Sequence, residues 1–140
     1  MEPRIILLFS GKRKSGKDYI CEKVKTLLGL KTPGIFCKAA CDNAHIKAVW
    51  LVSDIRRKTD IAWFKDAYGS KIKTIRITAN LDVRKNRGWL FTKGVDDVAS
   101  ECDLDEFLNW DIQVSNNNTE ESEEAIEKII NTVKDSLKED

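Results

Sequence analysis

Seven residues near the amino terminus have the types and the spacing of a phosphate-binding loop. The pattern G-x-x-x-x-G-K is matched by Gly11-Lys12-Arg13-Lys14-Ser15-Gly16-Lys17. Its two glycines let the backbone turn successive N–H groups inward, and a helix that begins near Lys17 would point its positive end at a bound anion. Lys17 would reach the outer phosphates as a point charge. We therefore predict a nucleoside triphosphate as the ligand; the alternative is a basic surface turn that contains two glycines by chance.

The residue after this loop is Asp18, where the usual pattern has Ser or Thr. The usual hydroxyl ligates magnesium, and a carboxylate is also a hard oxygen ligand that could hold Mg²⁺ directly or through water. The alternative is that Asp18 only stabilises the first turn of the helix, where a carboxylate is favourable. The two roles can coexist at one residue.

A strand before the loop and a helix after it would hold the loop in place. Residues 5–9 form a short apolar run that is typical of a strand buried on both faces. Residues 19–28 show helical spacing, and Gly29 is a stop signal. The apolar face of this helix carries Ile20, Val24, Leu27 and Leu28. This order of strand, loop and helix favours phosphate binding over a surface turn.

The rest of the chain alternates between strand and helix patterns. Strands are expected at 49–53, 71–78 and 110–115, and helices at 35–46, 60–68, 81–86 and from Thr119 onward. Thr119 would cap the last helix, without a capping box. The apolar face of that helix carries Ala125, Ile126, Ile129, Ile130, Val133 and Leu137. The alternation predicts an α/β domain with a parallel sheet flanked by helices, and residues 1–140 are expected to be one domain.

A second candidate site follows the strand at 49–53, which ends in Asp54-Ile55-Arg56-Arg57. Ligands of open α/β sheets bind outside the carboxyl ends of the strands, so these residues should lie on the same rim as the loop. Asp54 there can organise magnesium, and Arg56 and Arg57 can neutralise charge on a transferring phosphoryl group. The alternative is an acid at a helix start followed by a solvated arginine pair.

Two further segments could contact a nucleotide. Arg84 and Arg87 precede a glycine-bracketed loop at 88–94, which is the arrangement of a lid that closes over a triphosphate. An exposed charged helix explains the same arginines equally well. Asn116 and Asn117 follow the last strand, where their amides could read an adenine edge, although turn chemistry is their simplest explanation.

Composition restricts the classes of function. The chain is 41% hydrophobic and 34% charged, which is typical of a globular protein, and the net charge of +1 indicates no particular partner. The four cysteines form no C-x-x-C pair, and His45 gives them little help as a zinc site, so free thiols are expected. These cysteines are Cys21, Cys37, Cys41 and Cys102. The basic residues gather in one loop rather than along an aromatic-studded surface, which disfavours nucleic acid as a partner.

No apolar run approaches the length of a membrane span, and residues 1–9 lack the pattern of a signal peptide. We therefore expect no membrane association and a cytosolic (cytoplasmic) location. A monomer is also expected. The final residues, Lys138-Glu139-Asp140, are not a peroxisomal address of the SKL type, although a peroxisomal location stays open.

Taken together, these segments resemble the animal-type phosphomevalonate kinase family. The resemblance begins in the stretch from Leu7 to Asp18, including the unusual Asp after Gly-Lys, and continues in Trp50-Leu51-Val52-Ser53-Asp54-Ile55-Arg56-Arg57. Further matching stretches are Trp63-Phe64-Lys65-Asp66-Ala67-Tyr68-Gly69, Arg87-Gly88-Trp89, Gly94-Val95-Asp96-Asp97 and Ser100-Glu101-Cys102. Such long matches are far more specific than a phosphate loop alone.

This resemblance implies the P-loop NTPase fold in its nucleoside monophosphate kinase-like form. It also implies that ATP, with Mg²⁺, phosphorylates 5-phosphomevalonate to 5-diphosphomevalonate in isoprenoid and sterol biosynthesis. Residues 12–18 would bind ATP, Arg56 and Arg57 would contact the acceptor phosphate or the transferring group, and Arg87 would close on ATP from the lid. Asn116 and Asn117 would lie near the nucleotide base.

One departure from the family concerns the acceptor. Members carry an additional, largely helical segment between the first helix and the strand of Trp50, with further arginines that grip the acceptor. Here only residues 30–48 bridge Gly29 and Val49, not far above the minimum for a crossover between parallel strands. The acceptor-binding region is therefore expected to be reduced, as in a splice form or an incomplete gene model. An ATP-binding protein that has lost transfer activity is the alternative function.

Overall fold

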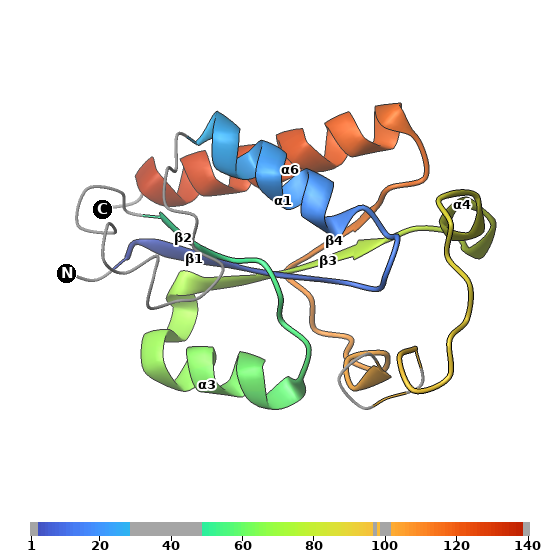
Figure 1. The fold of residues 1–140 in the computed structure, drawn as a ribbon. Helices are drawn as coiled ribbons and strands as arrows, with labels where there is room; N and C mark the ends of the chain where they lie inside the picture. The colour runs from blue at the N-terminus through green and yellow to red at the C-terminus, as the bar shows by residue number, and fades with distance from the viewer. Residues whose placement is uncertain (1–2, 29–48, 97, 99–101, 139–140) are drawn as a thin grey trace.

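A computed structural model describes residues 3–28, 49–96, 98 and 102–138 of the chain, and the predicted helix at 35–46 lies outside these ranges. Four parallel strands form one sheet in the order β2-β1-β3-β4 (Figure 1). They are β1 (Ile5–Gly11), β2 (Val49–Val52), β3 (Ile72–Thr78) and β4 (Ile112–Ser115). The predicted α/β class with a parallel sheet is therefore confirmed.

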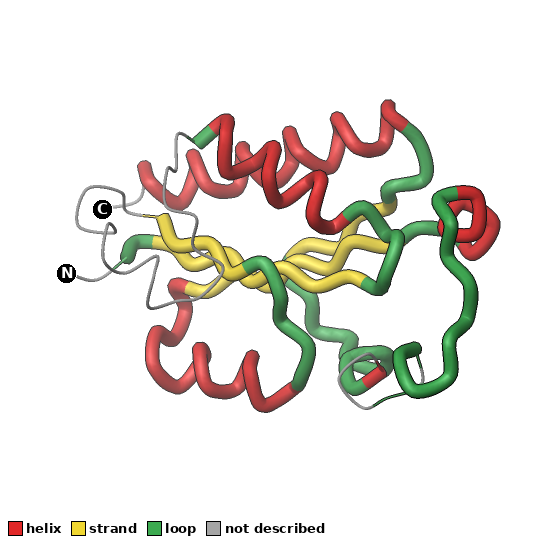
Figure 2. The backbone as a smooth tube through the Cα atoms, in the orientation of Figure 1, coloured by secondary structure: helices red, strands yellow, loops and turns green. Residues whose placement is uncertain are grey.

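Helices lie on both faces of this sheet, as the tube view makes plain (Figure 2). Helices α1 (Lys17–Leu27) and α6 (Thr119–Lys138) pack side by side on one face. Helix α3 (Lys58–Tyr68), which a 3₁₀ turn at Gly69–Lys71 follows, covers the other face together with residues 102–110. The short helix α4 (Leu81–Asn86) lies beyond the end of β3.

Strand β1 separates the two hydrophobic cores because its side chains alternate between the faces. Leu7 and Phe9 belong to the core under α1 and α6, whereas Ile6 and Leu8 belong to the core over α3. All four side chains are fully buried, as expected for the central strand of a parallel sheet. The predicted inner face of α6 is confirmed, with Ala125, Ile129 and Val133 buried and Ile126, Ile130 and Leu137 packed against them.

Several predicted details of the elements are wrong. Leu27 was expected on the buried face of α1, yet it is 65% exposed. Thr119 does not cap α6: the side chain of Asn118 accepts a hydrogen bond from the backbone N–H of Glu121 (2.8 Å), and the Glu121 carboxylate accepts one from the N–H of Asn117 (2.8 Å). Helix α6 therefore begins with a reciprocal cap one residue earlier than predicted.

Two element starts move for identifiable reasons. Helix α3 begins at Lys58 rather than residue 60, because the Asp60 carboxylate accepts from the backbone N–H groups of Arg56 (3.2 Å) and Arg57 (3.1 Å). Strand β4 begins at Ile112 rather than residue 110, because the Asp111 carboxylate bonds to the backbone N–H of Thr74 (2.8 Å) in place of a strand ladder.

The carboxyl ends of all four strands meet at one edge of the sheet. The loops that leave this edge are 12–16 after β1, 53–57 after β2, 79–80 after β3 and 116–118 after β4. This edge is where open α/β sheets bind ligands. None of the helices in the described ranges is long and apolar enough to cross a bilayer.

Candidate phosphate-binding site

The loop from Gly11 to Gly16 connects β1 to α1, and its two glycines are required by the space around them. A Cβ on Gly11 would lie 2.6 Å from Ser15 Oγ and 2.9 Å from the carbonyl oxygen of Ile77. A Cβ on Gly16 would lie 2.0 Å from Asn116 Nδ2, and the φ of Gly16 is +88°. The backbone can therefore make this turn at the start of α1 only with glycine at residue 16.

We expect Gly16→Ala to lower the free energy of unfolding by about 4 kcal/mol, because backbone strain adds to the loss of the Asn116 contact. Urea unfolding measures the change. Gly69→Ala is the matched control, since Gly69 also has positive φ (+60°) but nothing within 4 Å of its Cβ position. The control should show strain alone, about 1–3 kcal/mol, with unchanged ATP affinity. The packing argument is wrong if the Gly16 variant binds ATP normally and is no less stable than the control.

Basic side chains surround a cleft of about 370 Å³ in front of this loop. Its lining consists of Gly11, Lys12, Arg13, Lys14, Gly16, Lys17, Asp18, Tyr19, Arg56 and Arg87. Lys17 Nζ lies 2.9 Å from Asp54 Oδ1, and Arg56 Nε lies 3.0 Å from Asp54 Oδ2. The expectation that Asp54 and Arg56 share one rim with the loop is therefore confirmed. Arg57 has an exposed side chain and is not among the lining residues.

Asp54 links the two cations that approach the cleft from different elements. Partial burial raises the pKa of Asp54, but hydrogen bonds from Lys17 and Arg56 outweigh this effect and hold the pKa below its usual value. Asp54 is therefore a carboxylate at neutral pH. It fixes the positions of Lys17 and Arg56 at the mouth of the cleft, where an anionic ligand would meet both charges.

The carboxylates near Lys17 fit a magnesium ion that is shared with a phosphate ligand. Asp18 Oδ1 lies 3.7 Å from Lys17 Nζ and its side chain is 93% exposed, and Asp54 Oδ1 lies 2.9 Å from the same ammonium group. Mg²⁺ is commonly held by one or two carboxylates plus substrate phosphates and water. Within the described ranges, no group of three or more acidic, His or Cys residues could hold a metal alone.

The arginines of the predicted lid contact the backbone of the loop. Arg84 Nε donates to the carbonyl oxygen of Arg13 (2.9 Å), and Arg87 donates to the carbonyl oxygens of Lys14 (2.9 Å) and Asn116 (2.6 Å). Asn116 is 2% exposed, and its Nδ2 donates to the carbonyl oxygen of Ser15 (2.9 Å). These side chains thus hold carbonyl groups of the loop in place, and direct contacts of Arg87 and Asn116 with a nucleotide stay predictions.

The side chain of Asn117 also makes a structural hydrogen bond. Its Oδ1 accepts a hydrogen bond from the backbone N–H of Asn80 (2.6 Å), which ties the loop after β4 to the start of α4. This contact agrees with the turn chemistry that was the simpler interpretation of the asparagine pair. A contact of Asn117 with the base stays a prediction.

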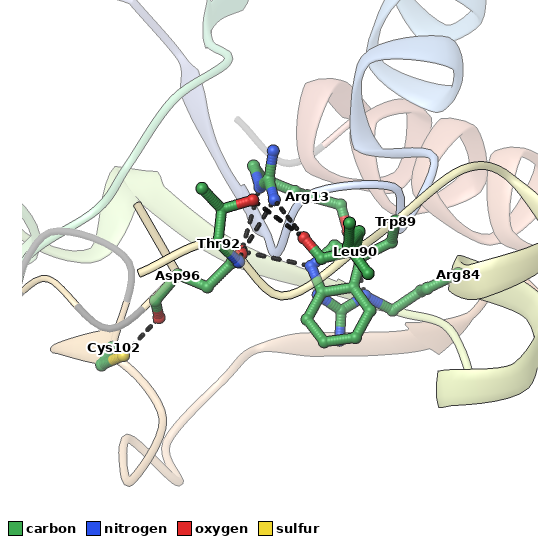
Figure 3. Close-up of polar contacts among 7 residues, drawn as sticks. All are labelled: Arg13, Arg84, Trp89, Leu90, Thr92, Asp96 and Cys102. Carbon is green, nitrogen blue, oxygen red and sulfur yellow. Dashed lines mark hydrogen bonds and ion pairs between the residues drawn. The ribbon is translucent and has the colours of Figure 1, made fainter. Parts of the chain in front are cut away.

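Two acidic residues of the site were missed by sequence reasoning, which named Asp96 only within a stretch that resembles the family and did not single out Asp105. Asp96 forms a two-point ion pair with Arg13, at 2.9 Å to Nε and 2.8 Å to Nη2 (Figure 3). Asp105 lies 3.0 Å from Lys12 Nζ. The available signal was charge complementarity between residues 96–105 and the basic loop, but nothing in the sequence selected these two acids.

The described cysteines are free thiols, as expected. Cys21 is buried on α1 and Cys102 is half-buried; Cys37, Cys41 and His45 lie outside the described residues. Burial raises the pKa of the Cys21 thiol to about 12. Cys21 therefore stays protonated at neutral pH and packs as an apolar side chain.

Comparisons with known proteins agree with these features. A model of the family "Phosphomevalonate kinase" matches residues 29–70. The chain is 33% identical to the phosphomevalonate kinase of Drosophila melanogaster over an alignment of 178 positions that covers 89% of this chain and 94% of the relative. Because 178 positions exceed the 140 residues of this chain, the relative carries residues within the alignment that are missing here.

Among solved structures, the fold is similar to the Mycobacterium tuberculosis APS kinase CysC in complex with AMPPNP and APS. The TM-score is 0.57 and the identity 15%, with 99% of each chain covered. This likeness confirms the predicted P-loop fold, in which a parallel sheet is flanked by helices.

Proposed function

Because the chain is a kinase of the phosphomevalonate kinase family, we propose that it transfers the terminal phosphoryl group of ATP to 5-phosphomevalonate, giving 5-diphosphomevalonate and ADP. The observation that carries the proposal is the convergence of Lys17, Asp54 and Arg56 at the mouth of the phosphate-loop cleft. Two cations held by one carboxylate suit a site in which negative charge moves between a donor and an acceptor.

The loop residues 11–18 are proposed to bind ATP, with Lys17 on its outer phosphates. Lys12, Arg13 and Lys17 all line the cleft and each forms an ion pair, with Asp105, Asp96 and Asp54 respectively. The backbone N–H groups of the loop would bind the phosphates together with Lys17. Arg87 and Asn116 contribute by holding the carbonyl groups of Lys14 and Ser15. The nucleotide base would lie beyond them, near Asn117.

The transfer itself needs no nucleophile from the protein. An oxygen of the acceptor phosphate forms a bond with the γ-phosphorus of ATP while the bond from that phosphorus to the β-γ bridging oxygen breaks, and ADP leaves. Lys17 and Arg56 would position the two phosphates in line and neutralise the charge between them, and Arg57 would help to bind the acceptor phosphate. Asp18 and Asp54 would hold Mg²⁺, which when bound supplies further charge neutralisation.

Replacing Asp18 with Ala is expected to raise the magnesium concentration needed for half-maximal transfer by about tenfold, because one hard oxygen ligand is removed. A magnesium titration at saturating ATP measures this effect. Asp66→Asn, which removes an exposed carboxylate on α3, should leave the titration unchanged. If Asp18→Ala behaves like this control, Asp18 serves only the first turn of α1.

The length of the alignment favours a second candidate, an ATP-binding protein whose reduced acceptor region no longer supports transfer. The aligned relative has residues that this chain lacks. The resemblance to the family implies that such a segment carries further arginines that bind the acceptor. Incubation with γ-³²P-ATP and 5-phosphomevalonate separates the two candidates. Labelled 5-diphosphomevalonate supports the kinase proposal, whereas tight ATP binding without labelled product would leave only the second candidate.

A further inference from the structure

The carboxylate of Asp96 is almost buried and fully engaged. Asp96 is 8% exposed and accepts four hydrogen bonds: from Arg13 Nε (2.9 Å) and Nη2 (2.8 Å), from Trp89 Nε1 (3.1 Å) and from the backbone N–H of Thr92 (2.7 Å) (Figure 3). Two of these donors belong to the phosphate loop and two to the loop that follows α4. One side chain therefore joins two segments that are 83 residues apart.

Arg13 is held at both its side chain and its backbone by one continuous segment, residues 84–96, which we call the brace. Besides the pair with Asp96, Arg13 Nη2 donates to the carbonyl oxygen of Leu90 (3.1 Å). The carbonyl oxygen of Arg13 accepts from Arg84 Nε (2.9 Å), and the Arg84 guanidinium lies 4.7 Å from the centre of the Trp89 ring. Asp96 and Arg84 thus contact Arg13 directly, and Trp89 links these two residues to each other (Figure 3).

A phosphate loop needs these supports for a physical reason. When its N–H groups turn toward the anion, its carbonyl groups turn away and must find donors elsewhere. Arg84 and Arg87 supply donors to the carbonyl groups of Arg13 and Lys14. Lys14 also has a φ of +64°, a conformation that a non-glycine residue keeps only when its surroundings hold it.

From this geometry we propose that Asp96 is a positioning residue for the donor nucleotide: through Arg13 it holds the phosphate loop in its binding conformation. In this arrangement Arg13 links the loop to the brace and does not itself bind phosphate. The brace and the loop then bind the donor phosphates as one unit. This inference rests on the proposed binding of ATP and adds a residue that the phosphate-loop pattern does not contain.

The ion pair between Asp96 and Arg13 is present at neutral pH and is lost only in acid. Hydrogen bonds from Arg13 hold the pKa of Asp96 well below its usual value, against a smaller opposing effect of burial. A carboxylate whose pKa is lower in the folded state stabilises the fold above its unfolded pKa of about 3.9, and that contribution is lost as the pH falls toward the folded pKa. Acid unfolding of Asp96→Asn should therefore depend less steeply on pH below about 4 than that of the wild type.

Calorimetric titration tests the positioning role without relying on transfer activity. Asp96→Asn should raise the dissociation constant for MgATP by about tenfold while the number of binding sites and the affinity for 5-phosphomevalonate stay unchanged. A merely structural role would instead lower the number of competent sites and leave the dissociation constant as it is. That result, or an unchanged MgATP affinity, would overturn the proposal.

A double-mutant cycle tests whether Arg13 only holds the loop in place or binds phosphate directly. If Arg13 acts through Asp96, Arg13→Gln should weaken MgATP binding as much as Asp96→Asn does, and the double variant should be no worse than either. Full additivity of the two losses would mean that Arg13 contacts the phosphates directly. Asp66→Asn, an exposed carboxylate on α3, is the control that should leave binding unchanged.

The Trp89 indole N–H reports the contact independently of any ligand. In a ¹H–¹⁵N spectrum its cross-peak is identified by its loss in Trp89→Phe, and it should move upfield in Asp96→Asn as a charge-assisted hydrogen bond weakens. Arg13→Gln should also shift it, which keeps the test decisive if Asp96→Asn does not fold. An unmoved peak in both variants overturns the brace. A wild type that does not bind ATP would refute the proposed function, and this spectrum would still decide the contact.

Discussion

Lys17→Met is expected to reduce turnover by about 10²- to 10³-fold, the usual effect of removing one preorganised charge from a developing negative centre. Methionine keeps an unbranched side chain but removes the ammonium group that lies 2.9 Å from Asp54 and lines the cleft. The loss should appear both in ATP affinity and in the rate of label transfer from ATP to 5-phosphomevalonate. Equal affinity and turnover in the variant would mean that the loop does not bind the donor phosphates.

Lys23→Met is the matched control for this substitution. Lys23 lies on the same helix, is exposed and is not among the residues that line the cleft, so its removal should leave turnover unchanged. The pKa of Asp54 gives a second readout. Because a hydrogen bond from Lys17 helps to hold that pKa down, Lys17→Met should raise it, and carbon-detected NMR of the carboxyl group can follow the titration.

Local patterns in the sequence were sufficient to predict the phosphate loop and its position between a strand and a helix. That Asp54 and Arg56 lie close to the phosphate loop could also be predicted. The carboxyl ends of parallel strands share one edge of the sheet, and both residues closely follow β2. In both cases the order and direction of the strands bring the residues together. No other side chain has to be ruled out as a partner to predict these contacts.

The side chains that hold the phosphate loop in place could not be predicted from the sequence. For each contact, the sequence offers several side chains of the same charge as candidate partners. Arg13 has several acids within 96–105 as candidate partners, and only the packing of the brace selects Asp96. Arg84 and Arg87 carry charges that suggest a phosphate ligand, yet their donors point at carbonyl groups of the loop. The cap of α6 is a smaller example: the sequence predicts Thr119, but the structure shows Asn118. Both Thr and Asn are common helix caps, so the residue type alone does not decide between them.

A reduced acceptor region would leave more of the binding of the acceptor phosphate to the arginines at the rim of the cleft. The alignment with the Drosophila relative contains positions that this chain does not fill. Arg56 and Arg57 lie between β2 and α3. If transfer occurs, these two residues must orient the acceptor phosphate with less help than in longer relatives.

Arg56→Gln is therefore expected to lower kcat by about 10³- to 10⁵-fold, the effect of an arginine that neutralises charge on a transferring phosphoryl group. Arg56 lines the cleft and is held by Asp54, which also holds Lys17. The Asp60 carboxylate fixes its backbone N–H at the start of α3. Initial rates of ³²P transfer at saturating substrates measure the change.

Arg57→Gln is the matched comparison, since the two arginines are adjacent and only Arg56 lines the cleft. Arg57 is exposed, so its replacement should mainly raise the KM for 5-phosphomevalonate, with a much smaller fall in kcat. The two variants thus separate charge neutralisation during transfer from capture of the acceptor. Equal losses of kcat in both would place Arg57 at the transferring group as well, and an unchanged kcat in Arg56→Gln would remove Arg56 from it.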